Sequence, residues 1–112
     1  MQPETRKHLV DILDAAAGIR SFIHGFDLPA YQQDAKTRAA VERKLEIIGE
    51  ACSRIRDKDP ESFVLLVYAH QVIGLRNRVI HGYDSVDDAI VWDVVSNKLD
   101  SFVVQVEAMA HA

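Results

Sequence analysis

Apolar residues recur along most of this chain at spacings of three and four, the period of one face of an α-helix. The first such stripe begins after Pro3, which suits a first helical position, and ends before Gly25, which suits a helix end. We therefore expect the first helix between these two residues. Its predicted buried stripe consists of Leu9, Ile12, Leu13, Ala16, Ile19 and Ile23.

A second, longer helix is predicted from Asp27 to about Arg56. The Asp27 side chain can accept hydrogen bonds from the first turn, and Pro29 fits within that turn. Because a single cysteine cannot form an intrachain disulfide, Cys52 is interpreted as a small core residue of this helix. The predicted buried stripe consists of Ala40 or Val41, Leu45, Ile48, Cys52 and Ile55.

The second half of the chain predicts two more long helices. The apolar run 61–67 fits either a strand or a short helix, of which we expect the helix. A third long helix should extend from about Tyr68 to His81 and stop at Gly82, and Ser85 with Asp88 resembles the capping box of a fourth. The predicted buried positions are Tyr68, Val72, Leu75 and Val79 in the third helix, and Val91 or Trp92, Val95, Leu99, Phe102, Val103, Val106 and Met109 in the fourth.

Four long helices with short connections predict an all-α fold, an antiparallel up-and-down four-helix bundle with an additional short helix. At 112 residues the chain has room for one domain, spanning 1–112. No apolar run approaches the roughly 20 residues that cross a bilayer, and the first residues lack the apolar core of a signal peptide. A cytoplasmic protein without a membrane anchor is therefore expected.

The net charge of −4 disfavours a nucleic-acid partner, but the charge is unevenly distributed. Residues 84–112 hold six acids against one lysine, whereas residues 36–58 hold seven basic residues against four acids. The basic segment fits an ordinary solvated helix surface with pairs such as Glu50 to Arg54, and it also fits a contact with nucleic acid. Charge alone does not decide between these interpretations.

The third long helix carries a polar face opposite its predicted core stripe. His70, Gly74, Asn77 and His81 follow the three-to-four spacing of this face, and Arg76 lies about 100° from Asn77. A guanidinium group matches phosphate oxygens, and an imidazole can move protons near neutral pH. These residue types suit phosphodiester chemistry.

Each of these residues also has an ordinary structural interpretation. Arg76 fits a surface arginine, His81 a helix-end cation favoured by the helix dipole, and Asn77 a solvent-facing side chain. At about 100° per residue, Arg76 and His81 lie about 140° apart, so spacing alone does not make them a pair. A joint site would require Arg76 to reach round the helix, the helix end at Gly82 to fray, or a second subunit.

Sequence motifs for metal or cofactor binding are absent. The five histidines include no His-x3-His pair with a carboxylate, and the lone cysteine makes no Cys-x2-Cys motif. No P-loop or glycine-rich dinucleotide fingerprint occurs in the chain. Any chemistry is therefore expected to need neither a metal nor a cofactor.

Three ordered segments resemble the HepT-like family of HEPN proteins. Residues 74–83, Gly-Leu-Arg-Asn-Arg-Val-Ile-His-Gly-Tyr, resemble the family's Arg-x4-His-x-Tyr signature. Residues 40–51 resemble its long helix, which characteristically ends in Gly-Glu-Ala, and Val91-Trp92 falls where the family has its last-helix tryptophan. The chain departs from the pattern at Tyr68-Ala69, where Pro-Trp is common, and at Leu99-Asp100, where Leu-Pro is frequent.

This resemblance implies an RNA endonuclease that is the toxin of a toxin–antitoxin pair and works as a homodimer. The implied catalytic residues are Arg76, which would stabilise charge on phosphorus, and His81, which would act as general acid or base. Asn77 and His70 would support them, and the expected RNA end is a 2′,3′-cyclic phosphate. Glu50 would either anchor Arg76 or pair with its own helix neighbour Arg54, and the spacing slightly favours the second.

Tyr83 matches the family tyrosine that a partner nucleotidyltransferase antitoxin modifies with AMP. The resemblance implies inhibition by that modification, and the alternative is a tyrosine that packs over the helix end. For the whole chain, the competing hypotheses are a catalytically silent HEPN dimer that binds a nucleotide or a nucleotidyltransferase, and a plain helical dimerisation protein.

Overall fold

The computed structural model describes the backbone of residues 1–80 and 87–112 and the side chains of residues 1–78 and 87–112. Within these ranges all regular structure is helical, which confirms the all-α prediction. None of the described helices is long and apolar enough to cross a membrane. The elements are α1 (Pro3–Ile23), α2 (Leu28–Gln33), α3 (Ala35–Lys58), α4 (Pro60–Phe63), α5 (Ala69–Ile80), α6 (Asp88–Asp93), the π-helical turn η1 (Val94–Lys98) and α7 (Leu99–Ala110).

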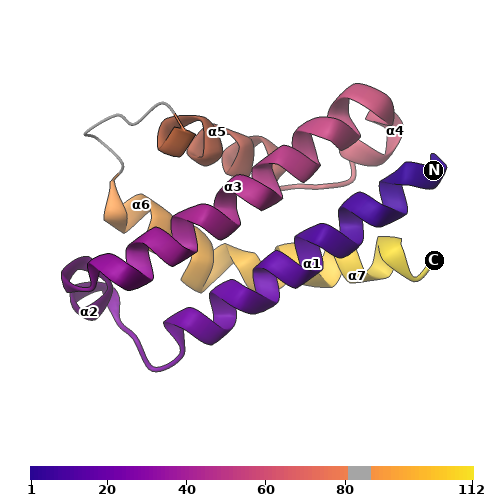
Figure 1. The fold of residues 1–112 in the computed structure, drawn as a ribbon. Helices are drawn as coiled ribbons and strands as arrows, with labels where there is room; N and C mark the ends of the chain where they lie inside the picture. Colours follow the sequence, from indigo (N-terminus) through magenta and orange to yellow (C-terminus); the bar gives the residue numbers. More distant parts are fainter. Residues whose placement is uncertain (81–86) are drawn as a thin grey trace.

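The long helices pack as a bundle in which α3 contacts both α1 and α5, while α1 also contacts α7. Figure 1 shows α1, α3, α5 and the α6–α7 rod following one another in alternating directions, with both termini at the same end. At that end Arg6 Nη1 donates a hydrogen bond of 2.7 Å to the carbonyl oxygen of Ala110. The first and last helices are therefore joined beside the termini.

The predicted core stripes of the first two long helices are buried in the structure. Every predicted position of α3 is buried with Val41 rather than Ala40, and burial raises the pKa of the Cys52 thiol to about 12. In α1, Leu13 and Ile23 are half-buried and pack against the core, while the other predicted positions are buried. The helical period therefore identified the inward faces correctly.

The predicted continuous helix from Asp27 to Arg56 is wrong at one point. Asp27 does cap a helix start, accepting a hydrogen bond of 2.9 Å from the Ala30 backbone, but that helix is the short α2. Asp34 then adopts an extended backbone and accepts a 3.0 Å hydrogen bond from the backbone of Thr37, which starts α3. A short aspartate side chain competes for backbone N–H groups and so favours a new helix start over a helix interior.

Two further expectations are corrected in the second half of the chain. The run 61–67 is helical only up to Phe63, within α4. The last rod begins at Asp88 with Asp87 as its cap. The predicted capping role of Ser85 lies outside the described residues. A π-helical turn interrupts the predicted single α-helix of this rod.

A buried carboxylate fixes the start of α1 against the end of α3. Asp59 Oδ2 accepts hydrogen bonds from the Gln2 backbone at 2.9 Å, the Thr5 hydroxyl at 2.7 Å and the Ser62 hydroxyl at 2.8 Å. These donors hold the pKa of Asp59 well below its usual range. The junction thereby sets the two helices side by side at the end of the bundle where the candidate site lies.

Candidate functional site

Arg76 of α5 lies directly across Gly49 of α3. A Cβ atom added at Gly49 would come within 2.5 Å of Arg76 Cβ and 2.8 Å of Arg76 Cγ, distances that real Cβ atoms do not show. The missing side chain therefore lets α5 approach α3 closely and lets the arginine stem cross the helix. This explains the glycine of the Gly49-Glu50-Ala51 segment.

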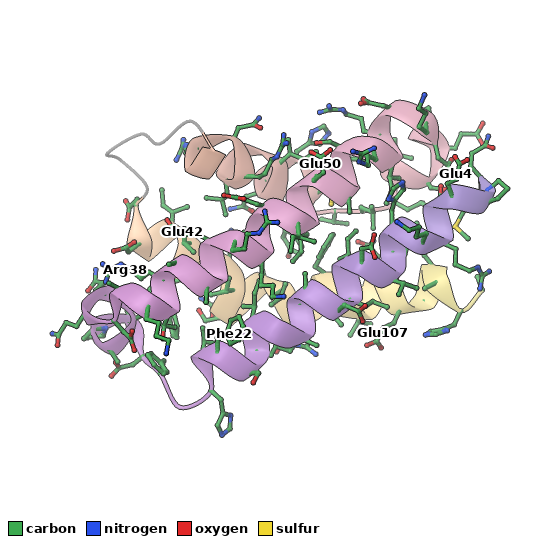
Figure 2. All side chains as sticks on the ribbon, viewed as in Figure 1. Glu4, Phe22, Arg38, Glu42, Glu50 and Glu107 are labelled. Carbon is green, nitrogen blue, oxygen red and sulfur yellow. The ribbon has the colours of Figure 1, made fainter. Side chains whose placement is uncertain are left out.

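Glu50 binds the guanidinium group that Gly49 admits. Its Oε2 lies 2.6 Å from Arg76 Nη2, and its Oε1 lies 3.1 Å from Arg54 Nε. The sequence-based preference for the Arg54 pair was incomplete, because one carboxylate holds both cations. Figure 2 shows Glu50 on the part of α3 that passes beside α5.

Asn77 supplies the second contact to the Arg76 guanidinium. Arg76 Nη1 donates a hydrogen bond of 3.2 Å to Asn77 Oδ1, and the Arg76 side chain is 25% exposed. Arg76 Nε is buried and has no hydrogen-bond partner in the described part of the chain. The guanidinium is thus held from two directions while part of it remains accessible from solvent.

The remaining members of the polar face are more widely spread. His70 is exposed and packs edge-on against Phe63, with ring centroids 4.9 Å apart. It lies seven residues before Asn77, about 10 Å along the helix, and the structure does not bring it to Arg76. Gly74 is exposed, and an added Cβ there would have nothing within 4 Å, so no contact with another described residue requires this glycine.

His81, Gly82 and Tyr83 lie outside the described residues. The pairing of Arg76 with His81 and the modification of Tyr83 therefore remain predictions. Among the described residues, no group of three or more His, Cys, Asp or Glu side chains is arranged to hold a metal ion. The candidate site is therefore built from Gly49, Glu50, Arg76 and Asn77.

Two adjoining surface pockets of about 670 and 650 Å³ accompany this site. Both are lined by Arg76, Glu50 and Arg54, together with Lys7 and His8 of α1. Sequence reasoning did not single out Lys7 or His8, because no local pattern says which side of α1 faces the end of α3. The basic balance of segment 36–58, which contributes Arg54, was the signal that pointed to this region.

Comparisons with known proteins identify the family of this chain. Residues 12–109 match the family described as Ribonuclease HepT-like. A protein of Methanocaldococcus jannaschii named "Putative RNase MJ0127" is 33% identical over 107 residues, covering 93% of this chain and 85% of that protein. "Putative RNase MJ1380" of the same organism is 32% identical over 104 residues, covering 93% and 94%.

A third relative comes from another organism. "Probable ribonuclease HepT" of Thermococcus cleftensis is 32% identical over 104 residues, covering 90% of this chain and 91% of that protein. No solved structure gives a significant match. Because the family match spans most of the chain and includes both the Gly49-Glu50 segment and Arg76, this protein belongs to the HepT-like family of HEPN ribonucleases.

Proposed function

We propose that this protein is a metal-independent RNA endonuclease and the toxin of a HEPN/nucleotidyltransferase toxin–antitoxin pair. The observation that carries the proposal is the guanidinium of Arg76, which crosses Gly49 and is held by Glu50 and Asn77. A cation fixed in this way loses little freedom when it binds a phosphate oxygen, and it can stabilise charge that develops there.

The reaction is a transesterification within the RNA. The 2′-oxygen of the ribose forms a bond to phosphorus, and the bond from phosphorus to the 5′-oxygen breaks. One proton leaves the 2′-hydroxyl and one is added to the 5′-oxygen, so the products are a 2′,3′-cyclic phosphate and a 5′-hydroxyl. His81 performs one of these proton transfers, and Arg76 stabilises the negative charge on the pentacovalent phosphorus.

A homodimer would complete this site. Arg76 and His81 lie about 140° apart on a regular helix, so an Arg76 of one subunit and a His81 of the other could share one phosphodiester. Exposed Gly74 lies on the same helix with open space where a side chain would be, which supports close approach of a second copy. Size-exclusion chromatography with light scattering tests this part of the proposal, and a monomer that cleaves RNA would contradict it.

Inhibition is proposed to follow from AMP transfer to Tyr83 by the cognate nucleotidyltransferase. A phosphate two residues beyond His81 would compete with RNA for the Arg76 cation and fill the space beside it. Co-expression with the transferase, followed by mass spectrometry of parent and Tyr83→Phe proteins, should show added AMP on the parent alone. An unmodified parent protein that is nevertheless inhibited would contradict this mechanism.

The decisive experiment compares RNA cleavage by parent, Arg76→Ala, His81→Ala and Arg78→Ala proteins in EDTA. Arg78→Ala is the matched control, because it removes an exposed arginine from the same helix. We expect Arg76→Ala and His81→Ala to lower the cleavage rate by about 10²–10³-fold, and Arg78→Ala to change it little. Mapping the RNA ends identifies the cyclic phosphate. A parent protein that binds RNA without cutting it would favour the catalytically silent HEPN module.

A further inference from the structure

The two pockets beside Arg76 form one groove between the beginning of α1 and the part of α3 from Arg43 to Lys58. They share Lys7, His8, Glu50, Arg54 and Arg76. Along α3 the groove extends from Arg43 to Lys58, which at 1.5 Å per helical residue is about 22 Å. Figure 2 marks this end of the bundle by Glu4 on α1 and Glu50 on α3.

Both pockets of this α1–α3 groove carry more cations than acids, although the whole chain has a net charge of −4. The pocket nearer Arg43 is lined by four cations and three acids. The pocket at the Lys58 end is lined by three acids and by the five cations Lys7, Arg54, Arg56, Lys58 and Arg76. Counted once each, the residues of the groove are six cations and five acids, a net charge of +1 against −4 for the whole chain. The groove is therefore more favourable for an anion than the chain as a whole.

Most cations of the groove pair with one of its acids: Lys7 with Asp11, Arg43 with Glu46 and Arg56 with Asp57. These pairs lie at the surface, where salt bridges are weak, so their cations can exchange a carboxylate for a phosphate. Glu50 is shared by Arg54 and Arg76, so one carboxylate faces two guanidinium groups. Arg54 uses Nε for that contact, its side chain is 61% exposed, and its terminal amino groups can still bind another acceptor. Lys58 makes no salt bridge within the described part of the chain, and His8 lines both pockets.

The lining also indicates which polyanion fits. Ile47 and Ala51 are its apolar residues, and no aromatic side chain other than His8 lines either pocket in the described ranges. A protein partner would need apolar anchor positions, which this surface lacks. Guanidinium and ammonium groups repeated along about 22 Å instead suit the regularly spaced phosphates of a nucleic-acid strand.

From these observations we propose that the α1–α3 groove binds the backbone phosphates of single-stranded RNA and leads the strand to Arg76. This inference rests on the proposed ribonuclease function, since Arg76 lies at both the groove and the candidate site. Because the contacts are to phosphates and no stacking platform lines the groove, binding there is indifferent to base sequence. Any base preference then arises at the cleavage site itself.

The test measures binding separately from cleavage. A fluorescent single-stranded RNA with 2′-O-methyl groups cannot be cleaved through its 2′-oxygen, so its anisotropy reports binding alone. Lys7→Ala/Lys58→Ala removes one groove cation from α1 and one from α3. The matched control, Arg20→Ala/Lys36→Ala, removes one cation from each of the same helices outside the groove, with the same change in net charge.

We expect the groove variant to bind the RNA several-fold more weakly at low salt. The slope of log K against log salt concentration should become shallower by about 1.4, which is about 0.7 for each lost phosphate contact. The control should bind as the parent does. Equal affinities for the two variants would overturn the groove proposal. So would a poly-glutamate peptide of equal charge that binds more tightly than the RNA, because the groove would then be a site for acidic proteins.

Cleavage of unmodified RNA by the same proteins keeps this proposal distinct from the proposed function. If the parent protein cleaves RNA and the two double variants bind equally, the nuclease assignment stands and the groove proposal fails. If the groove variant alone loses binding and the parent cuts no RNA, the groove proposal stands and the nuclease assignment fails.

Discussion

Two carboxylates, Glu50 and Asp59, are nine residues apart on the chain and differ in burial and in the groups they bind. Asp59 is 5% exposed and accepts hydrogen bonds from a backbone N–H and hydroxyl groups. The Glu50 side chain is 41% exposed and holds the two cations Arg54 and Arg76 at the edge of a groove. A buried carboxylate satisfied by neutral donors stabilises a junction, whereas an accessible one shared between cations positions groups that can meet a ligand.

Outside the two proposed catalytic residues, the substitution expected to have the largest effect is Gly49→Ala, because it removes the space that Arg76 occupies. The closest atom, Arg76 Cβ, is fixed by the backbone of α5, so no side-chain rotation relieves the 2.5 Å contact. We expect α5 to shift, the free energy of unfolding to fall by about 1–3 kcal/mol and the cleavage rate to fall at least tenfold. Urea unfolding and RNA cleavage measure both.

Gly18→Ala is the control for this prediction. An added Cβ there would meet Lys44 Cε at 3.1 Å, and the end of a lysine side chain can move aside. Alanine also favours a helix over glycine by up to about 1 kcal/mol, so Gly18→Ala should preserve or increase stability. Equal behaviour of the two variants would show that Gly49 is not required for the Arg76 contact.

Glu50→Gln should separate activity from stability. Loss of the charge weakens the hold on Arg76, and we expect the cleavage rate to fall about tenfold, as for loss of an orienting contact of roughly 1.4 kcal/mol. Because the pair is partly exposed, the melting temperature should change little. Glu107→Gln, at an exposed position of α7 outside the groove, is the control. A large loss of stability in Glu50→Gln alone would make Glu50 a structural residue like Asp59.

Asp59→Asn should give the reverse result. An amide in place of the carboxylate cannot accept all the hydrogen bonds from Gln2, Thr5 and Ser62 equally well, so we expect the melting temperature to fall by several degrees. The cleavage rate of the protein that remains folded should stay close to that of the parent. Thermal unfolding followed by circular dichroism, with cleavage measured well below the transition, tests this separation.

The smallest expected effect is the loss, at acid pH, of the stability that Asp59 contributes to the fold. The pKa of Asp59 is lowered in the folded state, so its contribution to stability is complete well above the unfolded value of about 3.9 and declines as the pH falls below it. The difference in melting temperature between the parent and Asp59→Asn should therefore narrow from neutral pH toward pH values below about 4. A difference that stays constant over this range would rule out the charged form as its source.

Local patterns in the sequence were sufficient for the helices and their inward faces. The three-to-four spacing identified the buried side of α3 position by position, and Asp27 was correctly identified as a helix cap. These features depend on contacts between residues a few positions apart, which the helical period makes predictable. The same locality explains the error at Asp34, where a cap within a polar stretch resembles an ordinary helix residue.

The sequence by itself thus determined an all-α chain, its core stripes, and the HepT-like motifs that contain Glu50 and Arg76. Only the tertiary structure decided that Arg76 crosses Gly49, that Glu50 holds two arginines at once, and that Lys7 and His8 share a groove with them. The physical reason is distance along the chain. Residues 26 or more positions apart meet only when whole helices pack, and the depth of that packing depends on a single missing side chain.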